Sequence, residues 1–112
     1  MSDTIPSCEA CRPDAEKVDP AKLEKYLSQV PEWRLEERNG VQMISRDYKF
    51  KNFALALEFT NKVGAIAEEI NHHPELVTEW GKVRVTWWSH TIKGLHELDF
   101  AMAKRCEAVF SA

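Results

Sequence analysis

Hydrophobic positions along the chain follow two different spacings, which predicts a domain of helices and strands. Apolar residues recur every three or four positions in three stretches, as on the buried face of an α-helix: residues 19–30, residues 52–70 and the part after Gly94. Apolar and polar residues alternate in four shorter stretches, as in β-strands: residues 33–35, 41–48, 75–80 and 82–89. This order predicts an α+β fold, αββαββα, with a four-stranded antiparallel sheet and three helices packed on one face.

Several boundaries of these elements carry local signals. Asp19–Pro20 supplies a helix N-cap acceptor followed by proline at the first helical position. Asn39–Gly40 is typical of a two-residue type I′ hairpin, because both positions of that turn take a positive φ. The alternation slips between Met43 and Ile44. A bulge and a strand buried on both faces would each explain the slip, and the sequence leaves both open.

The first part of the chain lacks these patterns. Residues 1–18 are polar, contain two prolines and show no apolar periodicity, so we expect a flexible N-terminal arm. Residues 19–112 then form a single domain, as expected for a chain of 112 residues. Cys8, Cys11 and Cys106 are an odd number of cysteines, so we expect a reducing compartment and no disulfide framework. The role of Cys8 and Cys11 stays open.

Composition excludes several classes of partner. The chain is 44% hydrophobic and 29% charged, with a formal net charge of −3. Its lysines and arginines are interleaved with a larger number of acids, so we expect no nucleic-acid partner. No apolar run approaches the ~20 residues of a membrane span, and the first residues resemble neither a signal nor a transit peptide. We therefore expect a cytoplasmic protein without a membrane partner.

Candidate chemistry gathers in the second half of the chain. The segment Asn71-His72-His73-Pro74 is followed by His90 and Asp99. Imidazole is the side chain whose ordinary pKa lies closest to neutral pH, so three such groups suit a reaction that moves protons. Pro74 disfavours the α region for the residue before it, which places the histidine pair at a helix-to-strand corner. The set predicts an acid/base site.

Each of these residues also has a purely structural explanation. The histidine pair can cap a helix end or face solvent, and His90 can belong to a polar rim at the end of a strand. If His96 is an N-cap, Asp99 occupies the third helical position, where a carboxylate accepts amide protons. Trp88 shares a strand face with His90 and is the tryptophan that we expect near a ligand. The combination around one corner favours a pocket.

A zinc site is the main alternative for three histidines. Adjacent histidines before a proline usually diverge, and neither a His-x-x-x-His spacing nor a Cys/His pattern is present. Cys8-x-x-Cys11 is a single pair, with no second pair to complete a tetrahedral site. We therefore expect no metal.

Together these residues resemble the pterin-4a-carbinolamine dehydratases, a family whose animal members are also the dimerisation cofactor of a homeodomain transcription factor. The resemblance runs from Asp19 to the C-terminus and is carried by four segments: Glu68–Pro74, Trp80–Val83, Trp87–His90 and Gly94–Asp99. The sequences of residues 80–95 and of the Cys8–Cys11 arm are most similar to those of bacterial members associated with phenylalanine hydroxylase.

The resemblance implies a 4a-hydroxytetrahydrobiopterin dehydratase, a hydro-lyase that needs no cofactor. It would remove water from the pterin-4a-carbinolamine to give quinonoid dihydropterin, and so recycle the cofactor of aromatic amino acid hydroxylases. By motif match, His72 and His90 would be general acid/base groups, and His73 would bind the pterin and assist proton transfer. Substrate-binding or orienting roles would fall to Glu68, Asp99 and Trp88. The natural pterin and the individual roles of the histidines stay open.

The resemblance also implies partners. Family members are dimers or tetramers, so we expect a homo-oligomer of unspecified order, with a functional link to phenylalanine hydroxylase. The alternative function is a protein-interaction or regulatory module that resembles a transcriptional coactivator. Substituting the histidines separates the two, because a binding-only role would survive the substitutions and catalysis would not.

Overall fold

Helices and strands follow one another in the order that the sequence periodicity predicts. The computed structural model describes residues 9–12 and 14–111. A short 3₁₀ turn, η1 (Glu9–Cys11), comes first. The remaining elements are α1 (Pro20–Ser28), β1 (Arg34–Arg38), β2 (Val41–Lys49), α2 (Phe53–Ile70), β3 (Glu75–Glu79), β4 (Lys82–Trp87) and α3 (Glu97–Ser111). The predicted α+β fold, with its αββαββα order, is confirmed.

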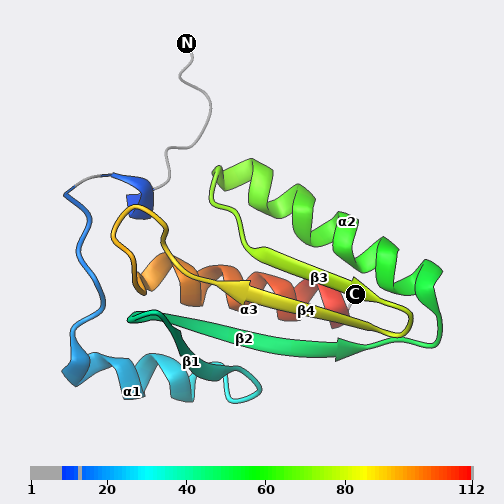
Figure 1. Ribbon diagram of the computed structural model, residues 1–112, viewed down its shortest axis with the longest axis horizontal. Coiled ribbons are helices and arrows are strands. Elements are labelled where there is room, and N and C mark those ends of the chain that lie inside the picture. Colours follow the sequence, from blue (N-terminus) through cyan, green and yellow to red (C-terminus); the bar gives the residue numbers. More distant parts are fainter. Residues whose placement is uncertain (1–8, 13, 112) are drawn as a thin grey trace, which may run out of the picture.

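The four strands form one antiparallel sheet in the order β1-β2-β4-β3, so the two hairpins pair through their second strands (Figure 1). The first hairpin turns at Asn39 and Gly40, whose φ angles of 52° and 81° are those of the predicted type I′ turn. Gly81 turns the second hairpin with φ 156°. Because β2 and β4 are antiparallel, the end of β4 at Trp87 lies beside Ile44 near the start of β2, and β3 begins at this same end of the sheet, next to the histidines.

The slip of alternation in β2 reflects burial on both faces. Met43, Ile44 and Ser45 are all buried. The pairing of β2 with β1 and β4 continues without a skipped residue, which rules out a bulge in this strand. Ile44 belongs to the helix-covered core, whereas its two neighbours lie on the opposite face.

The core lies between the sheet and its helices. Helix α2 begins at the N-cap Asn52, whose side chain accepts from Leu55 N, and it buries one stripe of apolar residues. Val83, Val85 and Trp87 of β4 pack against this stripe and against α3. The buried residues of the two helices are Ala56, Phe59, Val63, Ile66 and Ala67 in α2, and Phe100, Met102, Ala103 and Cys106 in α3.

A polar cluster fixes α3 to the sheet at the far end from the histidines. The carboxylate of Glu107 accepts hydrogen bonds from Trp33 Nε1 at 3.0 Å, from the Arg46 guanidinium and from the Tyr48 hydroxyl. Partial burial alone would raise the pKa of Glu107, but the three donors outweigh it and hold this pKa below its usual value. Glu107 is therefore a charged anchor between α3 and β2.

The described part of the N-terminal segment contacts the domain. Ala10 is fully buried, and Val18 N donates a 2.8 Å hydrogen bond to Leu95 O. The expectation that structure begins at Asp19 did not include these contacts, because one small buried residue gives no periodic signal. The flexibility of residues 1–18 stays a prediction. Within the described ranges, no helix combines the length and apolarity that crossing a membrane requires.

Candidate active site

The end of α2 places two histidines at a corner. Asn71 caps the helix in a left-handed conformation, with φ 59° and ψ 40°, and His72 N donates to Ala67 O at 3.2 Å. Pro74 follows at once and β3 begins at Glu75. The chain therefore leaves the helix sharply, and the two imidazoles point in different directions, one into the protein and one towards solvent.

His72 is the buried member of the pair. The residue is 2% exposed, and its Nε2 lies 2.6 Å from Asp99 Oδ1. Its ring stacks on Trp87 at a centroid distance of 5.6 Å and an interplanar angle of 21°. An ionised carboxylate accepts a hydrogen bond from Nε2–H in this geometry, so the other ring nitrogen, Nδ1, points away from Asp99.

Asp99 holds the first turn of α3 as well as the imidazole. Its Oδ2 accepts from Ser89 Oγ at 2.7 Å and from His96 N at 2.9 Å, while His96 Nδ1 accepts from Leu98 N at 3.0 Å. As expected if His96 is the N-cap, its side chain thus binds the amide of the second helical residue, and the carboxylate of the third reaches back to the amide of His96. The capping contact and the imidazole contact therefore occur together on a single, fully buried carboxylate.

The other predicted residues form a group beside this pair, in which Glu68, His73 and His90 are exposed and Trp88 is half-buried. His73 Nε2 lies 2.5 Å from Glu68 Oε2, one helical turn back on α2. His90 Nε2 lies 3.3 Å from His73 O, and the rings of His90 and Trp88 are 4.4 Å apart. Since His73 and His90 are both exposed, a ligand from solvent can reach them directly.

All six residues that the sequence singled out are thus linked, but in two sets. The buried set is His72 with Asp99, and the exposed set is His73, His90 and Glu68 together with the half-buried Trp88. Sequence reasoning missed two contributors to the buried set, Ser89 and Trp87. Both lie next to residues that it named, but a strand pattern alone shows neither a hydrogen bond to Asp99 nor a stacked imidazole.

The cysteines differ from the expectation. Cys11 is disulfide-bonded, so the inference of a reducing compartment from the cysteine count loses its basis. Cys8 lies outside the described residues. Cys106 is a free thiol in the core, and burial raises its pKa to about 12, which makes the reactive thiolate scarce. Among residues 9–12 and 14–111, no group of three or more histidines, cysteines and acids is placed to hold a metal ion.

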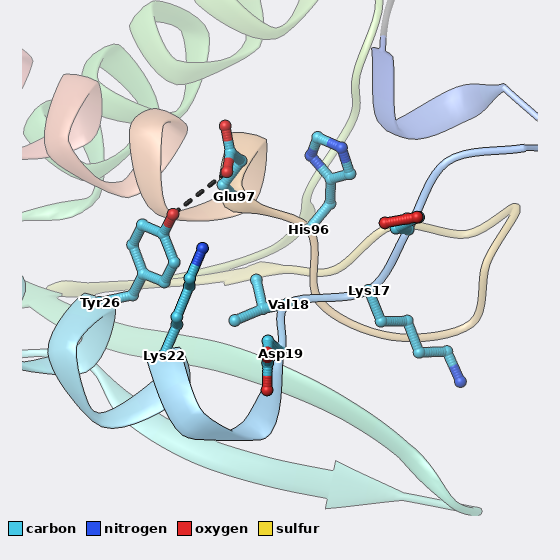
Figure 2. A pocket seen from close by; sticks show the side chains of 8 residues that line it. Lys17, Val18, Asp19, Lys22, Tyr26, His96 and Glu97 are labelled. Carbon is cyan, nitrogen blue, oxygen red and sulfur yellow. Dashed lines mark hydrogen bonds between the residues drawn. The ribbon is translucent and has the colours of Figure 1, made fainter.

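A cavity of about 460 Å³ lies on the other side of His96, between the N-terminal segment, α1 and the start of α3 (Figure 2). Tyr26 Oη donates to Glu97 Oε2 at 3.1 Å within it. Its other lining side chains include Lys17 and Lys22 as well as acids. It contains none of the six predicted site residues, and charges of both signs line it without favouring one kind of ligand.

The family model "Pterin 4 alpha carbinolamine dehydratase" matches residues 16–109, which include the whole histidine corner and Asp99. The chain belongs to this family. A pterin dehydratase fold therefore carries the buried and exposed sets described above, and the predicted resemblance is confirmed.

Relatives of known sequence and structure agree with this family. The chain is 99% identical, over the full length of both proteins, to a Hahella chejuensis protein named "Putative pterin-4-alpha-carbinolamine dehydratase". A crystal structure of a transcriptional coactivator/pterin dehydratase from Brucella melitensis matches with a TM-score of 0.74 and 30% identity, over 84% of this chain and 98% of that one. A pterin dehydratase-like RuBisCO assembly factor of the α-carboxysome shares the fold, with a TM-score of 0.60, 23% identity, and coverage of 71% and 90%.

Proposed function

We propose that this chain is a pterin-4a-carbinolamine dehydratase whose proton transfers use the histidine corner. Family membership gives the reaction class. The single observation that carries the proposal is the buried pair of His72 and Asp99, joined at 2.6 Å beside two solvent-exposed histidines. A carboxylate that holds one nitrogen of an imidazole and orients the ring is a recurring arrangement for acid/base catalysis.

The reaction needs two proton movements. The substrate is a tetrahydropterin with a hydroxyl on carbon 4a, and the products are water and quinonoid dihydropterin. The hydroxyl leaves as water after it receives a proton, and the ring nitrogen N5 gives up its proton as the C–N double bond forms. Imidazole side chains can supply the first proton and take the second, without a redox cofactor.

Roles follow from exposure and pairing. His90 is exposed, so it can reach the 4a hydroxyl or N5 directly, and we assign it a general acid/base role with His72. Asp99 would hold His72 through the hydrogen bond to Nε2 and would stabilise an imidazolium formed during the reaction. His73, oriented by Glu68 at 2.5 Å, would bind the pterin, and Trp88 offers a flat face beside the site.

The same proposal extends to partners and location. We expect a biopterin-type substrate, a homo-oligomer of two or four chains, a functional link to phenylalanine hydroxylase and a cytoplasmic location. The hydroxylase would produce the 4a-hydroxy compound that this chain consumes. The interaction-module alternative has no support from a specific contact in the described part of the chain.

The decisive experiment measures decay of the 4a-hydroxy intermediate in a coupled hydroxylase reaction. Added protein should accelerate the decay, and a chelator such as EDTA should leave the acceleration unchanged. A His72→Ala, His90→Ala double variant is the matched control, and it should give only the uncatalysed rate. Decay at the uncatalysed rate with wild-type protein would refute the proposed function, and rescue by zinc after EDTA treatment would refute its metal-free form.

A further inference from the structure

The η1 turn brings Cys11 to the histidine corner from a distant part of the sequence. Its Sγ lies 3.6 Å from Asn71 O and 3.9 Å from His72 Nδ1, across sequence separations of 60 and 61 residues. Figure 1 shows the turn, in blue, beside the loop that joins β4 to α3. Cys11 therefore stands next to the imidazole nitrogen that Asp99 does not hold.

Two further contacts tie this segment to the same site. Ala10, next to Cys11, is fully buried, so the turn is seated on the domain. Val18 N donates to Leu95 O at 2.8 Å, and Leu95 directly precedes the residue whose amide binds Asp99. The segment is thus attached at both ends of its described length to the elements that position His72.

The family model does not account for this contact. It matches residues 16–109, so Cys11 lies outside the matched region. None of the roles assigned above to the histidine corner includes the turn.

The environment of His72 is otherwise fixed on two sides. Asp99 holds the Nε2 edge of the ring at 2.6 Å, and Trp87 stacks on one face. The Nδ1 edge faces the sulfur of Cys11. Because Cys11 is disulfide-bonded, its sulfur carries no proton, and its effect on Nδ1 is one of shape and of excluding water rather than of donating a hydrogen bond.

We propose that Cys11 is a positioning residue of the dehydratase site, whose sulfur packs against one side of the Nδ1 edge of His72. This inference rests on the proposed function. With the sulfur in place, the ring stays turned with Nε2 on Asp99, and substrate approaches Nδ1 from one direction. Without it, water enters beside Nδ1 and competes for the proton, and the imidazole loses the fixed geometry that efficient proton transfer needs.

The test compares three variants. Cys11→Ala removes the sulfur and its volume, Cys11→Val loses the disulfide but fills a similar volume, and Arg12→Ala changes an exposed neighbour that pairs with Asp14. Steady-state dehydration gives kcat and KM, and ¹⁵N NMR of the His72 ring reports its tautomer and its exchange broadening. We expect Cys11→Ala to lower kcat about tenfold with KM little changed, and to shift or broaden the ring signals.

The control variants show whether an effect of Cys11→Ala on kcat comes from the lost side-chain volume or from another cause, such as the lost disulfide. Cys11→Val should keep most of the wild-type kcat and ring spectrum, and Arg12→Ala should match wild type in both. Wild-type kcat and ring signals in Cys11→Ala, a rise in kcat, or equal losses in the alanine and valine variants would each overturn the proposal. If wild-type protein does not dehydrate the substrate, the proposed function fails, while the NMR comparison still tests the positioning of His72 by Cys11.

Discussion

Replacing Asp99 with asparagine separates the two duties of this carboxylate. The side-chain oxygen of asparagine can still accept from His96 N and Ser89 Oγ, which now lie 2.9 and 2.7 Å from Asp99 Oδ2. The amide NH₂ would then face His72 Nε2 in place of a carboxylate oxygen at 2.6 Å. Two donors cannot share that contact, so the ring would move its proton from Nε2 to Nδ1.

The expected magnitudes differ for stability and for rate. The helix cap survives and one neutral hydrogen bond replaces a charged one, so we expect a loss of at most about 1 kcal/mol in the free energy of unfolding. Catalysis loses the negative charge beside a developing imidazolium. Hydrogen bonds to charged groups contribute about 1.5–3 kcal/mol, and about 1.4 kcal/mol corresponds to a tenfold change in rate, so kcat/KM should fall by about tenfold to a hundredfold.

Two measurements on the Asp99→Asn variant check this reasoning: chemical unfolding and steady-state dehydration. Ser89→Ala is the matched control, because it removes one donor to the same carboxylate and leaves its charge in place. We expect kcat/KM of the control within about threefold of wild type. If Asp99→Asn keeps wild-type kcat/KM and is clearly less stable, the carboxylate serves only as a cap and its catalytic assignment is wrong.

Three other predictions address the remaining groups. His72→Ala and His90→Ala should each lower kcat by about 10²–10⁴-fold, whereas His73→Ala should mainly raise KM; wild-type turnover in the first two variants would contradict these roles. Because hydrogen bonds hold the pKa of Glu107 below its usual 4.5 despite partial burial, its stabilising effect is present above that value and is lost as pH falls through the lowered pKa. Glu107→Gln should therefore lower the free energy of unfolding by about 1 kcal/mol at pH 7, after allowance for solvent screening. In urea unfolding, this difference in stability between variant and wild type should disappear in acid. A difference that does not depend on pH would refute the role of Glu107 as a charged anchor. His96→Ala should lose about 1 kcal/mol of stability and His96→Ser should not, since serine is a good N-cap; equal losses in calorimetry would argue against the capping contact.

Local signals in the sequence were enough for most of the fold. Asp19 caps α1 through a 2.9 Å bond from Ala21 N, and Asn39–Gly40 forms the predicted turn. Such caps and turns depend on neighbours in sequence, so a single chain reveals them. The slip at Met43 needed the structure, because burial on the second face of β2 depends on side chains from other strands.

The sequence predicted which residues belong to the site, but not which of their side chains contact each other. The exposed pair of Glu68 and His73 spans five residues, within reach of one helix end. His72 and Asp99 are 27 residues apart, and nothing in their spacing distinguishes this partnership from one between Asp99 and another histidine. The sequence predicts Trp88 as the stacking group for a ligand. In the structure the Trp88 ring lies against His90, while Trp87 on the opposite face stacks on His72.

Residues from three different elements bind Asp99, so the buried part of the site depends on how these elements dock. His72 comes from the end of α2, Ser89 from the end of β4 and His96 from the start of α3, and each makes a hydrogen bond to the same buried carboxylate. A buried charge is costly unless its partners are all in place, so the pair can form only when the helices and the sheet have docked. The exposed contact between His73 and Glu68 needs only the last turn of α2. Local unfolding that frees the α3 N-terminus should therefore remove the buried half of the site while leaving the exposed half able to form.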